Sequence, residues 1–224
     1  MLLLAIDTSA HLSAVSLYDC ENGITLQDDI QNIGRGHAEI VMKQVENCLE
    51  MAGRSYRDIG KIGVVKGPGS FTGVRVGLSV ARGLALSLKI DAIGVSGLDA
   101  LEAAAVETGF DGNITTVIDA RRDEAYCKIS GKDVPFVKPY KDIAACVPEN
   151  IATICGSGSK MLEMTSSRKF VILHELASPP IETVARLATD AEPEKHPPEP
   201  LYLRSADAKP QSGFTLKRTR DLNK

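Results

Sequence analysis

The chain has 224 residues, 43% of them hydrophobic and 4% aromatic, with a formal net charge of −3 at pH 7. This length suits one large domain or two smaller lobes with a proper core. The negative charge excludes a global basic field that would hold RNA, and the lack of tryptophan argues against stacking platforms for single-stranded RNA.

Cysteine usage and hydropathy bear on the cellular compartment. The five cysteines are scattered and form no Cys-x-x-Cys pair, which argues for a reducing environment and against a disulfide framework or a zinc ribbon. The N-terminal stretch MLLLAID meets Asp7 too early for a signal peptide, and no apolar run approaches the ~20 residues of a membrane span. We therefore expect a soluble cytoplasmic protein with no membrane segment.

The first thirty residues predict three antiparallel strands. Residues 2–6 are continuously apolar, as in a strand buried on both faces, and residues 12–18 and 24–30 follow as two further strands. The first tight turn is Asp7-Thr8-Ser9. It is either a local Asx/ST turn or a loop similar to the one that holds a nucleotide phosphate in actin-, Hsp70- and sugar-kinase-like folds. The glycine that those proteins usually carry there is missing.

Residues 37–52 predict an amphipathic helix that ends at Gly53. His37 stands at its start without a second histidine or clustered cysteines nearby. A role at the helix start or in an interface therefore fits His37 better than metal binding. The apolar face of this helix comprises Ile40, Val41, Val45, Cys48, Leu49 and Ala52.

The stretch 61–86 is the centre of the chain. A short apolar strand leads into the turn Gly67-Pro68-Gly69, and Ser70 is placed as the N-cap of a helix. A strand, a glycine turn and a helix N-terminus together favour anions, although the P-loop pattern GxxxxGK[ST] is absent. Small residues then recur every fourth position. Two glycines within a helix cost roughly 1 kcal/mol each relative to alanine, so the row packs closely against either the protein's own sheet or a second subunit. This row comprises Gly73, Gly77, Ala81 and Ala85.

The remaining sequence repeats the strand-and-helix alternation. Residues 90–95 predict a strand and 98–106 a helix capped by Ser96. Strands are then expected at 114–118, 124–129, 151–155 and 170–173, and a helix at 181–191. Gly156 and Gly158 form either a plain turn or an anion site. A proline-rich connector (192–200) and a basic tail follow.

The segment GPGSFTGVRVGLSVARGLAL (67–86) strongly resembles the signature of the TsaB (YeaZ) family, bacterial proteins that help make threonylcarbamoyladenosine in tRNA. The first turn, the segment DARRDEAYCKI (119–129) and residues 201–204 also resemble family segments. The resemblance implies an α/β, actin-like or Hsp70-like (ASKHA, ribonuclease H-like) fold with two lobes. We expect an N-terminal lobe (1–106), a degenerate C-terminal lobe (107–208) and a disordered basic tail (209–224).

The resemblance also implies partners. In the family, the helices that correspond to residues 37–52 and 70–86 pack against those of a second subunit. That subunit is the catalytic paralogue TsaD, or a second copy of the chain when TsaD is absent. The ATPase TsaE then joins, and tRNA is met only through the complex. The expected partner-contacting residues are His37, Ile40, Val41, Gln44, Val45, Cys48, Ser70, Gly73, Gly77, Ala81 and Ala85.

No catalytic constellation is visible. The four histidines lie in no GxSxG, HExxH or Cys–His pattern. TsaD carries a metal-binding HxxxH pair, and the comparable positions here are Gly97 and Leu101, which cannot ligate a metal. We therefore expect a non-catalytic scaffold subunit without a metal or a cofactor, leaving ATP or ADP at the interface of the complex open. The expected vestigial phosphate loops comprise Asp7, Thr8, Ser9, Gly67, Gly69, Gly156 and Gly158.

Two alternatives stay open at this point. One is an independent actin-like ATPase or kinase, which requires working phosphate loops at these turns. The other is a glycoprotease-like metallopeptidase, which requires metal ligands that the sequence does not supply.

Overall fold

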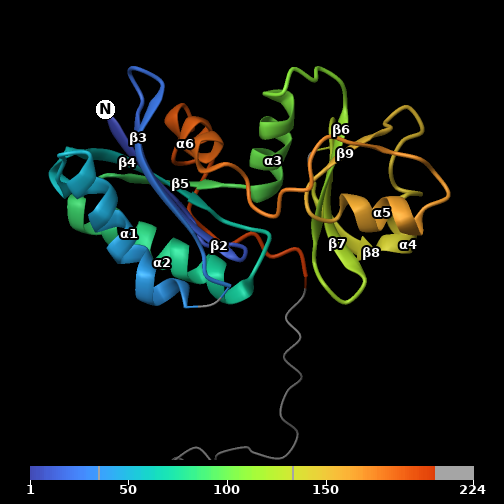
Figure 1. The fold of residues 1–224 in the computed structure, drawn as a ribbon, viewed down its shortest axis with the longest axis horizontal. Coiled ribbons are helices and arrows are strands. Elements are labelled where there is room, and N and C mark those ends of the chain that lie inside the picture. The colour runs from blue at the N-terminus through green and yellow to red at the C-terminus, as the bar shows by residue number, and fades with distance from the viewer. Residues whose placement is uncertain (35, 133, 205–224) are drawn as a thin grey trace, which may run out of the picture.

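A computed structural model describes residues 1–34, 36–132 and 134–204. In this part of the chain, two five-stranded sheets lie side by side, each with its own helices (Figure 1). The expected disorder of the tail (209–224) concerns residues outside the described ranges.

The first sheet has the strand order β3-β2-β1-β4-β5, and its first three strands are antiparallel while β4 and β5 run parallel to β1. Every residue of β1 is buried, because this central strand is covered on both faces. The three antiparallel strands predicted from the first thirty residues are confirmed. The strands are β1 (Leu2–Asp7), β2 (Leu12–Asp19), β3 (Ile24–Asn32), β4 (Ile59–Val65) and β5 (Asp91–Val95).

Helices cover both faces of this sheet. Figure 1 shows α1 (His37–Met51) and α2 (Phe71–Leu88) together on one face, and α6 (Ile181–Thr189) on the other. The alternation of side chains along β1 explains the two layers. Leu4 and Ile6 join the core under α1 and α2, whereas Leu3 and Ala5 join the core under α6. A short 3-10 helix (Tyr56–Asp58) leads into β4.

The second sheet repeats the topology of the first. Its order is β10-β9-β6-β7-β8, in which β6, β7 and β8 are antiparallel while β9 and β10 run parallel to β6. This duplication makes the chain a two-lobed, actin-like α/β protein of the ribonuclease H-like class. The strands are β6 (Ile114–Asp119), β7 (Glu124–Ile129), β8 (Phe136–Pro139), β9 (Thr153–Cys155) and β10 (Val171–Ile172), and the helices are α3 (Gly97–Val106), α4 (Tyr140–Ile143) and α5 (Ser159–Thr165).

The expected extent of the C-terminal lobe (107–208) needs a correction. Helix α6 falls in that range, yet its buried residues pack against β1 and β4 of the first sheet. Lys61 of β4 fixes it there, because the Lys61 ammonium donates to the carbonyls of Ala188, Thr189 and Ala191 at the end of α6. The chain therefore returns to the first lobe with α6. A helical periodicity shows which face is apolar but not which sheet that face will cover.

Candidate partner-binding surface

The inner face of α1 points into its own lobe. Val41, Val45 and Cys48 are fully buried in the core under the first sheet. Gln44 is also buried, and its amide donates to the carbonyls of Ser13 and Asp29 on β2 and β3. These four side chains were expected to contact a partner, and the structure corrects this expectation because the protein's own strands cover them.

Three further residues of the expected contact set are His37 and Ile40 at the start of α1 and Ser70 at the start of α2. The His37 ring is buried, and its Nε2 lies 3.2 Å from the carbonyl oxygen of Leu12. Ile40 is half-buried. On α2, Ser70 is exposed and is the N-cap, as predicted, because its hydroxyl accepts from the Gly73 amide.

The row of small residues on α2 packs against the first turn of the chain. The carbonyl oxygen of Gly73 accepts the Thr8 hydroxyl hydrogen bond at 2.7 Å. A Cβ at Gly73 would approach the Thr8 carbonyl oxygen closer than any real contact, and one at Gly77 would lie 2.6 Å from Thr8 Oγ1. Ala81 and Ala85 are buried as well. Of the two alternatives for this row, the structure selects the protein's own sheet, so the row is not a partner surface.

The same close packing fills the first turn. Asp7, Thr8 and Ser9 are nearly inaccessible, and the Asp7 carboxylate accepts from the Ser9 amide as in an Asx turn. The Ser9 carbonyl accepts from the Ser70 amide at 2.7 Å, and Gly69 lies directly against it. The turns at 7–9 and 67–69, both expected as vestigial phosphate loops, are thus brought together, but each occupies the space in front of the other.

Burial also affects the charge of this turn. Loss of solvation raises the pKa of the Asp7 carboxyl, although its hydrogen bonds with Ser9 act in the opposite direction. Among the described residues, Asp7 Oδ2 has no hydrogen-bond partner. The corresponding glycines of the second lobe, Gly156 and Gly158, pack against Val117 at the end of β6 and do not meet the first pair.

The outer face of α1 and α2 is where the surface is open. Helix α2 is long and apolar enough, by length and composition, to cross a membrane, and only 28% of it is buried. Its buried side covers β4, and Val76, Val80, Leu84 and Leu88 are partly buried at the edge of the same core. Phe71 is 57% exposed and Leu86 is 83% exposed. Exposed and half-buried apolar side chains along one face of a helix are a candidate protein-binding surface.

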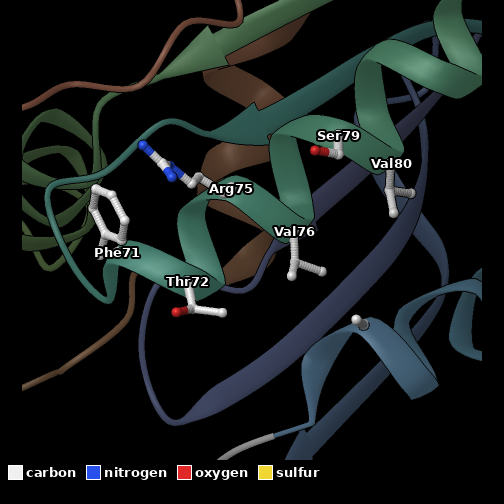
Figure 2. Close-up of a pocket in the computed structure, with 7 residues that line it drawn as sticks. Phe71, Thr72, Arg75, Val76, Ser79 and Val80 are labelled. Carbon is white, nitrogen blue, oxygen red and sulfur yellow. The ribbon is translucent and has the colours of Figure 1, made fainter. Parts of the chain in front are cut away.

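Two shallow hollows lie along this outer face. The first, of about 390 Å³, lies between α1 and α2, and Figure 2 shows the α2 side chains that line it. The second, of about 510 Å³, separates the end of α2 from the proline-rich connector. The first is lined by Ala38, Phe71, Thr72, Arg75, Val76, Ser79 and Val80, and the second by Arg82, Gly83, Ala85, Leu86, Ile90, Asp91, Ala92, Pro193, Pro197 and Pro198.

A cluster of two rings and one cation stands at the start of α2. The Arg75 guanidinium lies 3.8 Å from the centre of the Phe71 ring, and its Nε donates to the Tyr202 hydroxyl at 2.8 Å. The Phe71 and Tyr202 rings are 5.7 Å apart. Aromatic residues and arginine are the types enriched at the centres of protein interfaces. None of these three residues was among the contact residues expected from the sequence, although Phe71 and Arg75 lie within the quoted signature.

Leu101, one of the two positions that the sequence analysis compared with metal ligands, is buried in an apolar cluster. Leu101 packs with Leu98 and Ile118, and its carbonyl oxygen lies 3.2 Å from Nε2 of His174. Burial lowers the pKa of His174, which keeps its ring neutral at pH 7. In the ranges that the structure describes, no three His, Cys, Asp or Glu side chains gather as a metal site.

These features define a class of protein. The fold has two actin-like lobes, the turns at 7–9 and 67–69 of the first lobe pack against each other, and exposed apolar side chains lie on the outside of a helix pair. A family model described as "TsaD: tRNA N6-adenosine threonylcarbamoyltransferase" matches residues 31–130.

Individual relatives bear the TsaB name. The TsaB proteins of Escherichia coli and Bacillus subtilis are 36% and 38% identical over 126 residues, which is 56% of this chain and 53% of each relative. The chain thus spans about half the length of these curated relatives. An uncharacterized protein of Mycobacterium tuberculosis is 28% identical over 93% of this chain and 94% of its own.

A solved structure covers almost the whole chain. YeaZ from Pseudomonas aeruginosa superimposes with a TM-score of 0.76 at 28% identity, covering 90% of this chain and 99% of that one. The chain is thus similar in sequence to TsaB proteins over about half of its length and similar in fold to YeaZ over most of it.

Proposed function

We propose that this chain is a non-catalytic subunit in the formation of threonylcarbamoyladenosine in tRNA, and that it acts in the cytoplasm by contact with TsaD. The names of its relatives support the pathway. The exposed apolar outer face of α2 supports the mode of action, and it is the observation on which the proposal rests.

The proposed partner follows from the match to the TsaD family. The matched residues 31–130 contain α1, β4 and α2, so a TsaD protein is expected to carry an equivalent helix pair. Two related chains that use the same surface form a pseudo-twofold dimer, and two copies of this chain form a true twofold dimer when TsaD is absent. In the proposed complex, TsaE joins this pair. The net charge of −3 fits a subunit that meets tRNA through its partners.

The contact residues in this proposal differ from those expected from the sequence. They lie on the outside of the helix pair, where Phe71, Arg75, Val76 and Leu86 of α2 are joined by Ala38 of α1. The buried row from Gly73 to Ala85 supports this surface from beneath. The proposal includes no resident cofactor in this chain and leaves ATP or ADP at the interface of the complex open.

The experiment is a reconstitution. Purified TsaD, TsaE and an enzyme that produces threonylcarbamoyl-AMP are given tRNA, with and without this chain, and the modified adenosine is counted. Modification that requires the chain supports the proposal, whereas equal modification without it contradicts the proposal. A metal analysis and an ATPase assay of the chain alone test the metallopeptidase and kinase alternatives.

Surface variants locate the contact. Leu86→Asp and Phe71→Asp place a carboxylate on the exposed face of α2 and are expected to abolish binding to TsaD and the modification that depends on it. Met164→Asp is the matched control, because Met164 is 73% exposed on α5 of the second lobe. Loss of binding in all three variants, or in none, would show that the outer face of α2 is not the docking surface.

A further inference from the structure

The last described residues of the chain, Leu201–Arg204, form a strap whose side chains reach different parts of the molecule. The Leu201 amide donates to the Lys66 carbonyl in the first lobe at 2.8 Å. The Tyr202 hydroxyl accepts from Arg75 on the outer face of α2, and the Tyr202 ring lies beside Phe71. The first half of the strap is therefore anchored to the first lobe and to the proposed docking surface.

The second half of the strap is anchored to the second lobe. Leu203 packs against the apolar cluster of Leu98, Leu101 and Ile118, where α3 meets β6. Arg204 donates to the carbonyl of Ala120 and pairs with the Glu124 carboxylate, and both of these residues lie at the β6–β7 hairpin. Four consecutive residues thus link the outside of α2 to the second lobe.

This link lies within reach of a partner. Tyr202 is 50% exposed, and Phe71 and Arg75 beside it are exposed as well. A protein that covers Phe71 and Arg75 also covers Tyr202, and it favours the conformation in which the strap is docked. Because such coupling is reciprocal, a docked strap must raise the affinity for that partner by the same factor.

We infer that the strap couples the docking surface of α2 to the second lobe, so that binding at Phe71, Arg75 and Tyr202 fixes the β6–β7 hairpin through Leu203 and Arg204. Tyr202 is then a further contact residue, and Leu203 is a positioning residue that acts through it. This inference rests on the proposed function, since the occupant of the surface is the TsaD paralogue.

The test is the affinity of the full chain for purified TsaD, measured by calorimetry. Leu203→Ala removes side-chain atoms that do not reach the outer face of α2, and it is expected to weaken binding about tenfold, within the usual range of coupling between sites. Arg204→Ala cuts the same link with less change to the apolar packing and is expected to act in the same direction. The matched control is Leu173→Ala, which removes the same atoms from another apolar cluster at the second lobe. It is expected to change the affinity less than about twofold.

A double-mutant cycle separates coupling from general damage. In the Arg75→Ala background the hydrogen bond from Arg75 to Tyr202 is already lost, so Leu203→Ala should weaken binding by less than about twofold further. A second readout is hydrogen exchange at the Leu201 amide, which should slow at least about threefold when TsaD binds.

The outcomes distinguish the two proposals. If the wild-type chain does not bind TsaD, the proposed function fails and this inference fails with it. If the wild-type chain binds but Leu203→Ala binds equally well, or the effects of Leu203→Ala and Arg75→Ala multiply, or the Leu201 amide exchanges as before, the inference is overturned and the proposed function stands.

Discussion

The packing of α2 predicts opposite effects for the same substitution at two glycines of one helix. Gly73 lies against the Thr8 carbonyl oxygen, so a methyl group there forces the backbone of the buried first turn to move. Gly83 is exposed, and a methyl group there meets nothing within 4 Å. Replacing glycine by alanine in a helix interior by itself stabilises by about 1 kcal/mol.

The magnitudes follow from these contacts. Overpacking of a fixed site costs about 3 kcal/mol, and loss of the hydrogen bond from the Thr8 hydroxyl to Gly73 costs about 1 kcal/mol more. Against the gain in helix propensity, Gly73→Ala is expected to lower the free energy of unfolding by about 3 kcal/mol. Gly83→Ala is expected to raise it by up to about 1 kcal/mol.

Urea denaturation followed by circular dichroism measures both variants. With a slope of about 2–3 kcal/mol per molar urea, the midpoint of Gly73→Ala should fall by about 1 M or more, while that of Gly83→Ala should rise slightly. A Gly73→Ala variant as stable as the wild type, yet unable to bind TsaD, would refute this reasoning. Such a result would place the small-residue row in an interface after all.

Three further substitutions test other parts of the structure. Lys61→Met leaves the carbonyls at the end of α6 without their ammonium donor and should destabilise the first lobe by about 1–2 kcal/mol in calorimetry, and no change would contradict this role of Lys61. Arg168→Lys removes a guanidinium that donates to five carbonyls between residues 144 and 151, and it should lower the second-lobe stability by about 2 kcal/mol, with an unchanged melting curve as the contradicting result. Asp7→Asn tests the pH dependence of stability. Because the pKa of Asp7 in the folded state is raised above 3.8, the free energy of unfolding of the wild type should fall as the pH rises from about that value through the folded-state pKa. The variant should lack this fall. Equal pH profiles would contradict the raised pKa, and tRNA modification by Asp7→Asn should match that of the wild type.

Much of the secondary structure could be predicted from local patterns. The continuously apolar run at 2–6 is β1, and the strand predicted at 114–118 is β6 with one residue more. The N-caps at Ser70 and Ser96 were predicted from hydroxyl side chains at the starts of helical periodicity, and both accept the expected amide hydrogen bonds. These features depend on neighbours within a few residues, which is why the sequence alone reveals them.

Short elements escaped the same reasoning. No element was predicted between residues 129 and 151, but Phe136–Pro139 forms β8 and Tyr140–Ile143 forms α4. A four-residue strand carries too few side chains to show a period. This strand forms because it pairs with β7 along residues 124–127, a contact that only the folded hairpin provides.

The sequence by itself determined most of the order of strands and helices and the glycine turn at 67–69. It also determined that another part of a protein packs closely against the small residues of α2. Glycine and alanine carry no side-chain signal that distinguishes a sheet from a partner, so the tertiary structure alone decided that the row meets Thr8. Likewise, the periodicity of α6 could not say that Lys61, more than a hundred residues earlier, would fix it to the first sheet. The strap contacts of Tyr202 and Arg204 join residues far apart in the chain, and such contacts exist only once both lobes have folded.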